Sequence, residues 1–174
     1  CSSDLTRTIT QAQNPSTPWA SLSKVQSSMS SLTAKDSVLF KAGDKFSGTL
    51  VVSYKTGLYF GSYGSGSNPL FYGTGSTVSS LIILRGTKST VFENWNISDT
   101  TISFTDRYIV AKIRIAFTIE QSSTSNIVKN CKLDRIGYGF YLTVSSGSNT
   151  ITGCDIGNLR IDRKSTRLNS SHRT

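Results

Sequence analysis

The chain has 174 residues, enough for one domain or part of one. Its 19 Lys and Arg against 10 Asp and Glu give a net charge of +9, which favours acidic partners such as nucleic acid or an anionic polysaccharide. No stretch is apolar enough for a transmembrane helix. The only histidine is His172, so residues 1–171 contain no Ser-His or Cys-His nucleophile pair and no His-containing zinc site.

Residues 1–16 are polar and predicted to be irregular, and a helix is predicted after them. Thr17 suits the N-cap and Pro18 the first helical position. Apolar residues then recur at helical spacing, at Leu22, Val25, Met29 and Leu32. We expect a helix of three to four turns whose apolar face is buried against the structure that follows.

Short segments rich in β-branched and aromatic residues come next, separated by Gly, Ser and Asn, as is typical of strands and turns. We expect a strand at Ser37 to Phe40, a turn at residues 41–44 and a second strand from Phe46 to Ser53. Gly61 to Gly75 is interpreted as a turn, because neither a following helix nor a lysine in register supports a phosphate loop. Leu81 to Leu84 is the next predicted strand.

Residues 122–156 contain a repeat: SSTSNIVKNCKL is followed 23 residues later by SSGSNTITGCDI. An earlier copy begins at Ser89 with an offset of 36, which we attribute to a 13-residue insertion within residues 98–114. Short strands at a fixed period predict a solenoid whose equivalent positions stack about 4.8 Å apart. The expected stacks are Phe117 with Phe140, Ile119 with Leu142, Val128 with Ile151, Cys131 with Cys154, and Leu133 with Ile156.

A sharp turn is predicted just before the inward positions Trp95 and Cys131. Asn94 and Asn130 precede them, and Gly153 takes this place in the third copy. Asn and Gly tolerate left-handed backbone angles. The stacked N-C-x-[LI] pattern resembles the right-handed parallel β-helix, or pectate-lyase-like, superfamily. The resemblance implies an all-β solenoid with the N-terminal α-helix as its cap, and an inward Asn ladder at this corner.

A second resemblance comes from the segment DSVLFKAGDKFSGTLVVS at residues 36–53, with NPSTPWASLSKV before it and FGSYGSGSNP after it. Together these segments resemble the N-terminal part of secreted bacterial right-handed β-helix repeat proteins. The resemblance covers roughly residues 14–156 and implies a secreted or cell-surface protein.

Residues 162–172 read DRKSTRLNSSH and match the translation of a common sequencing adapter at each position. We therefore expect residues 162–174 to be a non-native tail. Residues 17–161 are then expected to hold the capping helix and an incomplete β-helix.

Substrates of this superfamily usually lie along the outer face of one sheet, between the long loops that lead into it. The resemblance places that face on strands 81–84, 115–119 and 140–144, with walls at residues 98–114 and 134–139. The candidate binding residues are Lys112, Arg114, Arg135, Tyr138 and Tyr141. Outward strand positions are expected at Thr118, Glu120, Tyr141 and Thr143. Arginine pairs with carboxylates and aromatic rings stack on sugars, which suits acidic glycans, and ordinary solvated loop charge is the alternative.

Two functions agree with this pattern. One is a polysaccharide lyase acting on acidic glycans, in which Lys, Arg or Tyr removes the proton beside a uronate carboxylate. A hydrolase would need a pair of carboxylates, which no spacing identifies. The other is a non-catalytic surface or adhesive protein that binds glycans. Both imply a polysaccharide partner and not nucleic acid. No catalytic residue or metal ligand is identified, and calcium enters only through the family resemblance.

Cys131 and Cys154 are interpreted as small hydrophobic side chains in a stack. A disulfide is the alternative, although parallel stacked Cβ vectors suit it poorly. Lys132 and Asp155 are expected to form an exposed ion pair between coils that contributes little to stability.

Overall fold

A computed structural model describes residues 8–73, 77–100, 112–143 and 145–159. Two short helices, α1 (Ile9–Ala12) and α2 (Leu22–Ser28), and the 3-10 helix η1 (Met29–Ser31) precede a series of strands. None of the helices in these ranges is long and apolar enough to cross a membrane.

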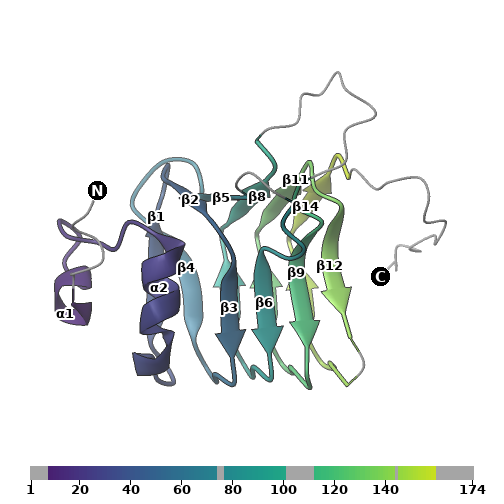
Figure 1. Cartoon of the computed structure of the whole chain (residues 1–174), viewed down its shortest axis with the longest axis horizontal. Coiled ribbons are helices and arrows are strands. Elements are labelled where there is room, and N and C mark those ends of the chain that lie inside the picture. The colour runs from purple at the N-terminus through teal and green to yellow at the C-terminus, as the bar shows by residue number, and fades with distance from the viewer. Residues whose placement is uncertain (1–7, 74–76, 101–111, 144, 160–174) are drawn as a thin grey trace.

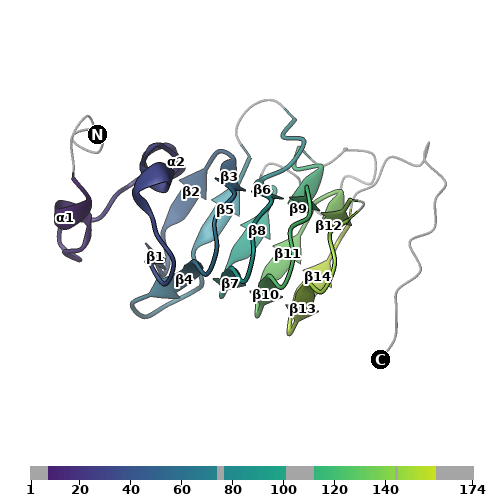
Figure 2. The same cartoon turned by 90° about the horizontal axis from the view of Figure 1, so that it is seen from below.

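The chain winds repeatedly through three parallel sheets, and each coil adds a strand to each sheet in turn (Figures 1 and 2). Sheet A contains β1 (Ser37–Lys41), β4 (Tyr59–Tyr63), β7 (Val91–Glu93), β10 (Ile127–Lys129) and β13 (Thr150–Thr152). Sheet B contains β2 (Lys45–Ser47), β5 (Leu70–Tyr72), β8 (Asn96–Ser98), β11 (Lys132–Asp134) and β14 (Asp155–Gly157). Sheet C contains β3 (Leu50–Ser53), β6 (Ile82–Arg85), β9 (Ile115–Glu120) and β12 (Tyr138–Leu142). The predicted all-β parallel β-helix with an N-terminal helix is confirmed.

The strand register confirms the predicted stacks: Phe117 pairs with Phe140, Ile119 with Leu142, Val128 with Ile151, and Leu133 with Ile156. The rings of Phe117 and Phe140 stack with their centroids 5.4 Å apart. Cys131 and Cys154 lie on successive coils, because the Asp155 N–H donates to the Cys131 carbonyl at 2.9 Å. The β8–β9 connection is 13 residues longer than the β11–β12 connection, which accounts for the longer offset of the first copy.

Aromatic side chains fill the column between the sheets. Trp95 is fully buried and stacks on Phe71 with a centroid separation of 4.1 Å. It also contacts Phe40 and Phe92 edge to face. Because each large aromatic side chain buries about 150–250 Å², this cluster supplies much of the stability of the first three coils.

Helix α2 closes the first coil, as predicted. Its apolar residues Leu22 and Val25, and Met29 just after it, are buried. The Gln26 side-chain oxygen accepts a hydrogen bond from the Val51 N–H at 2.7 Å. The helix thus covers both the apolar column and part of the open edge of β3.

The start and length of this helix differ from the prediction. Ser21 is the N-cap and accepts a hydrogen bond from the Lys24 N–H, so α2 has seven residues and continues as one 3-10 turn. Thr17 is not part of this helix, and its hydroxyl donates to the Gln11 carbonyl at 2.6 Å. The segment expected to be irregular contains α1, which begins with a capping box between Thr8 and Gln11.

Several strand boundaries differ from those predicted. The single strand expected at 46–53 divides at Gly48, whose φ of 111° turns the chain from sheet B into sheet C. The segment 61–75, expected to be a turn, holds the end of β4 and all of β5, because Phe71 packs into the column. Strand β6 covers Ile82–Arg85 rather than 81–84.

The predicted sharp turn is confirmed, with φ angles of 60°, 54° and 61° at Asn94, Asn130 and Gly153. The inward Asn ladder, however, lies at a different corner. The Asn130 amide is outside the column and donates to Glu93 at 3.4 Å. The ladder is formed by Asn126 and Asn149 between sheets C and A, where the wider corner leaves backbone groups that need side-chain partners.

Candidate functional site

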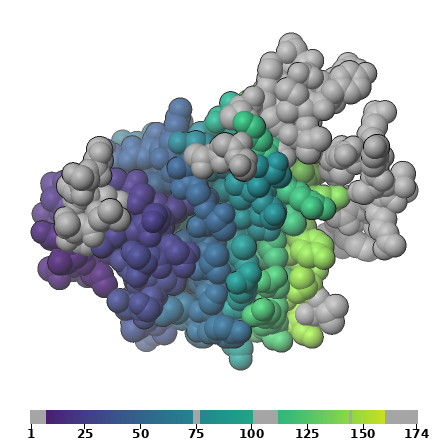
Figure 3. Space-filling view, viewed as in Figure 1, coloured from purple at the N-terminus to yellow at the C-terminus, as the bar shows by residue number. Residues whose placement is uncertain are grey.

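The outer face of sheet C is the surface on which the sequence placed the substrate (Figure 3). Two rows of outward residues cross the strands in register. The first row is Val51, Ile83, Thr118 and Tyr141, and the second is Ser53, Arg85 and Glu120. We call these two rows, together with Tyr54 and Gln121 at the corner beyond them, the sheet C face. Thr118 is outward as expected but 6% exposed, and its hydroxyl lies 2.6 Å from that of Ser80.

Tyr54 presents an exposed aromatic ring at the end of this face. Its side chain is 75% exposed, and its hydroxyl donates to the Gln121 side chain at 3.1 Å. The ring crosses the coil between them at Gly86, where an added Cβ would lie 2.7 Å from a ring carbon. The absence of a Cβ at Gly86 therefore leaves room for the ring, whereas its φ of 57° is shared by the stacked residues Tyr54 and Gln121, at 53° and 55°. The ring is held in place on one side and open to solvent on the other.

A charged pair lies beside this ring. Arg85 Nε is 2.5 Å from Glu120 Oε1, with side chains 43% and 23% exposed. A partly exposed pair of this kind contributes at most about 1 kcal/mol to stability. The other N–H groups of Arg85 and the carboxylate lone pairs of Glu120 can bind the hydroxyl groups of a ligand that stacks on the Tyr54 ring.

The predicted basic residues gather at the opposite end of the sheet C strands. The Tyr138 N–H donates to the Arg114 carbonyl at 2.7 Å, so these two residues lie on adjacent coils. Lys112 is two residues before Arg114, and its N–H donates to the buried Asp99 carboxylate at 2.6 Å. Arg114 is exposed, whereas Lys112 and Tyr138 are half-buried. Strand β9 runs from this end of the sheet to Glu120, and its first and last residues are roughly 16–17 Å apart at the usual rise per residue.

Tyr141 and Arg135 differ in their placement. Tyr141 is 53% exposed and belongs to the sheet C face, as predicted. The Arg135 Nε is 3.0 Å from Asp134, the last residue of a sheet B strand. Asp134 also accepts a hydrogen bond from Asn158 at 2.8 Å. Arg135 thus contacts a carboxylate at the end of a sheet B strand.

Three residues of the site were not among the sequence-based candidates: Tyr54, Arg85 and Gln121. Strand alternation after Ile83 could have identified Arg85 as an outward residue. No local signal connects Tyr54 with Gln121, which are 67 positions apart.

Carboxylates are scarce on this surface. Glu120 is the only one in the residues that define the sheet C face, and it is paired with Arg85. Within the described ranges, no three His, Cys, Asp or Glu side chains come close enough together to hold a metal ion.

The outer face of sheet A carries a tyrosine in a closed network. The Tyr59 hydroxyl donates to Glu93 at 3.0 Å, and Lys129 binds the same carboxylate at 3.0 Å. Burial acts to raise the pKa of Glu93, but the hydrogen bonds from Lys129 and Tyr59 hold it below its ordinary value. Burial, together with the bond to Glu93, raises the pKa of Tyr59. This network is less exposed than the Tyr54 end of the sheet C face, since Glu93 is 17% exposed and Tyr54 is 75% exposed.

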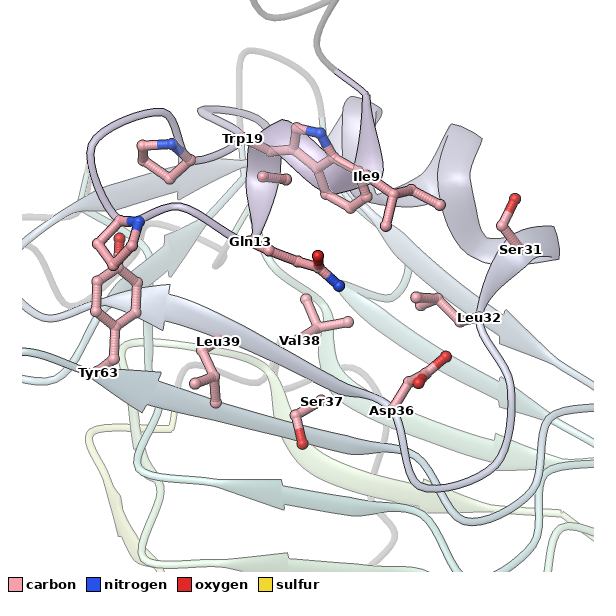
Figure 4. A pocket seen from close by; sticks show the side chains of 13 residues that line it. Ile9, Gln13, Trp19, Ser31, Leu32, Asp36, Ser37, Val38, Leu39 and Tyr63 are labelled. Carbon is pink, nitrogen blue, oxygen red and sulfur yellow. The ribbon is translucent and has the colours of Figure 1, made fainter.

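A cavity of about 510 Å³ lies at the N-terminal end, between α1, Trp19 and β1 (Figure 4). Its walls are largely apolar, with Ile9 and Trp19 on one side and Val38 and Leu39 on the other. Asp36, the one carboxylate in its lining, accepts hydrogen bonds from the Thr33 backbone and hydroxyl. Among the described residues, the lining contains no Lys or Arg that could pair with the carboxylates of an acidic glycan. The cavity was not predicted from the sequence.

Comparison with known families confirms the right-handed β-helix that the resemblance implied. Residues 23–162 match the family model described as the right handed beta helix region. The chain therefore belongs to the right-handed β-helix family, as its repeat pattern predicted. No curated protein sequence matches the chain significantly.

Two solved structures share the fold. The GH136 lacto-N-biosidase from Eubacterium ramulus superposes with a TM-score of 0.64 and 16% identity, over 86% of this chain and 32% of that one. The alginate lyase from Paenibacillus sp. str. FPU-7 gives a TM-score of 0.55 and 17% identity, over 79% of this chain and 56% of that one. The chain thus spans about a third and just over half of these two proteins.

Proposed function

We propose that this chain is part of a secreted or cell-surface polysaccharide-active protein whose sheet C face binds a glycan. The observation that carries the proposal is the exposed Tyr54 ring, fixed against Gly86 beside the Arg85–Glu120 pair. An aromatic ring next to planar charged groups suits a sugar, which has an apolar ring face and a rim of hydroxyls. The structural neighbours, a lacto-N-biosidase and an alginate lyase, support a carbohydrate ligand.

The finer part of the proposal is an acidic glycan and a lyase-like reaction. Lys112 and Arg114 lie at the far end of the same strands and would neutralise uronate carboxylates. Tyr138 is next to Arg114, and Tyr141 lies on the face itself. Either tyrosine is a candidate base for removal of the proton beside the neutralised carboxylate, after which the glycosidic oxygen leaves and an unsaturated sugar forms.

The second candidate is glycan binding without catalysis. It is favoured by the pairing of Glu120 with Arg85, which occupies the carboxylate of the sheet C face. Both candidates need the same binding surface, and only the first requires bond cleavage.

The binding proposal is tested by measuring affinity for alginate, polygalacturonate and a neutral glucan. We expect Tyr54→Ala to weaken binding about tenfold, or about 1.4 kcal/mol, because the stacking ring is lost. Tyr59→Ala is the matched control, since Tyr59 also lies against a glycine, Gly61, but on sheet A. Equal affinities of the wild-type and Tyr54→Ala proteins for each glycan would contradict the proposed site.

The acidic preference has its own test. Replacing Lys112 and Arg114 by Ala should weaken binding to alginate and polygalacturonate, and the loss should shrink as salt is added. Binding to the neutral glucan should not change. If the neutral glucan binds as well as the acidic polymers, the acidic assignment is wrong, and the binding site itself is tested separately by Tyr54→Ala.

The lyase reaction is followed by the ultraviolet absorbance of the unsaturated product. Activity that is lost in Tyr138→Phe or Tyr141→Phe, with binding retained, would identify the base. Binding without any unsaturated product, in the presence or absence of calcium, would favour the non-catalytic function.

A further inference from the structure

Two free thiols meet at the corner between sheets A and B. Cys131 is buried, with 1% of its surface exposed, and Cys154 on the next coil is half-buried. The coils are in register on both sides of the pair, since the Asn130 N–H donates to the Thr152 carbonyl at 3.1 Å and the Asp155 N–H to the Cys131 carbonyl at 2.9 Å. Neighbouring parallel strands lie about 4.8 Å apart, which is within the Cα separation that a disulfide can bridge.

The two thiols differ in accessibility and in acidity. The Cys131 thiol donates to the Lys129 carbonyl at 3.3 Å, and the Cys154 thiol donates to the Thr152 carbonyl at 3.5 Å. The adjacent Cys131 thiol lowers the pKa of Cys154 to about 6. The proximity of Cys154, together with burial, raises the pKa of Cys131. A thiolate is the reactive form of cysteine, so the more accessible Cys154 has the properties of an attacking group and the buried Cys131 those of a resolving group.

We propose that Cys131 and Cys154 form a reversible redox pair, which a small-molecule disulfide such as oxidised glutathione converts into a disulfide between adjacent coils. The Cys154 thiolate attacks one glutathione sulfur, forms a mixed disulfide and releases one glutathione thiolate. Cys131 then loses its proton to solvent and attacks the Cys154 sulfur, releasing the second glutathione. Two cysteine thiols are thereby oxidised, and one glutathione disulfide is reduced to two thiols.

The position of the pair makes the cross-link reversible. Stacked residues keep their Cβ atoms about 4.8 Å apart, slightly more than the 3.5–4.5 Å of an unstrained disulfide. The last coil must therefore move toward its neighbour. Within the described residues, β13 and β14 pair on one side only, so this coil is the one that can shift. A strained disulfide is more easily reduced than a relaxed one.

The test uses the full chain with Cys1→Ser, so that two thiols remain. After incubation with oxidised glutathione, we expect loss of both thiols, no glutathione adduct by intact mass, and a disulfide-linked peptide containing Cys131 and Cys154. Dithiothreitol should restore both thiols. Amide hydrogen exchange in β13 and β14 should slow severalfold in the oxidised form, because the last coil is then tied to its neighbour.

Single-cysteine variants separate the two roles. Cys131→Ser should stop at a stable mixed disulfide on Cys154, whereas Cys154→Ser should react at least tenfold more slowly. If the buried serine of Cys131→Ser prevents folding, Cys131→Ala is used in its place. Adducts on both cysteines without a cross-link, equal rates for the two variants, or no reaction of the parent protein would each overturn the proposal.

Discussion

The middle of the solenoid and its last described coil use the same kinds of residue at the same positions, but in different surroundings. Leu133 is fully buried, whereas Ile156, its partner in the next coil, is 43% exposed. In the same way Val128 is 1% exposed and Ile151 is 39% exposed. A stack position is therefore apolar in both coils, but it is buried only where another coil covers it.

The polar contacts follow the same division. Asn126 is 1% exposed and its side chain bonds to both neighbouring coils, whereas Asn149 is half-buried. The Glu93–Lys129 pair has side chains 17% and 36% exposed. The predicted Lys132–Asp155 pair is confirmed at 3.5 Å, with side chains 60% and 71% exposed. Matched substitutions in the two regions can measure what a covering coil contributes.

The largest difference is expected in the apolar stack. Leu133→Ala should lower the free energy of unfolding by about 2–5 kcal/mol, because it removes buried methyl groups and leaves a cavity. Ile156→Ala should cost about 1 kcal/mol or less, because the side chain already contacts water. Urea unfolding of both variants checks this prediction. Similar costs for the two would show that the last coil is covered in solution.

The asparagine ladder should show a smaller difference. Asn126→Ala should cost about 1–3 kcal/mol, because the Thr87 carbonyl and the Thr90 N–H lose a buried partner. Asn149→Ala should cost less, since water can replace part of its bonding. The comparison uses thermal unfolding, with hydrogen exchange at the Thr90 amide as a local readout. Loss of protection at Thr90 in Asn149→Ala alone would contradict this ordering.

The ion pairs should give the smallest effect, and it should depend on pH. Because the folded-state pKa of Glu93 is lowered, its contribution is present above the ordinary value of 4.5 and is lost as pH falls through the folded-state pKa. Glu93→Gln should cost about 1 kcal/mol at neutral pH and flatten the fall in stability below pH 4.5.

Asp155→Asn is the matched substitution at the exposed pair. It should leave the free energy of unfolding at neutral pH unchanged within error, because exposed ion pairs contribute little. Unfolding measured in urea between pH 3 and 7 compares the two variants, with pH values chosen to span the ordinary titration of a carboxyl group. A larger loss for Asp155→Asn than for Glu93→Gln would contradict the assignment of the stronger network to sheet A.

The sequence by itself determined the solenoid, because stacking repeats a residue type at a fixed period. The 23-residue repeat identified which residues stack, and the length of the insertion followed from the offset of the first copy. The apolar spacing of Leu22, Val25 and Met29 identified the cap. Local periodicity is enough for these features, since each depends on neighbours at regular separations along the chain.

Apart from the Lys132–Asp155 pair, which the repeat predicted, only the tertiary structure decided where the polar groups meet. The start of α2 depended on the cap formed by Ser21, and the strand division at Gly48 on a backbone angle. The Tyr54 ring reaches Gln121 across Gly86 because three coils bring their corners together. Such contacts join single residues at irregular separations, and their geometry is set by the stacked backbone, so the sequence pattern carries no trace of them.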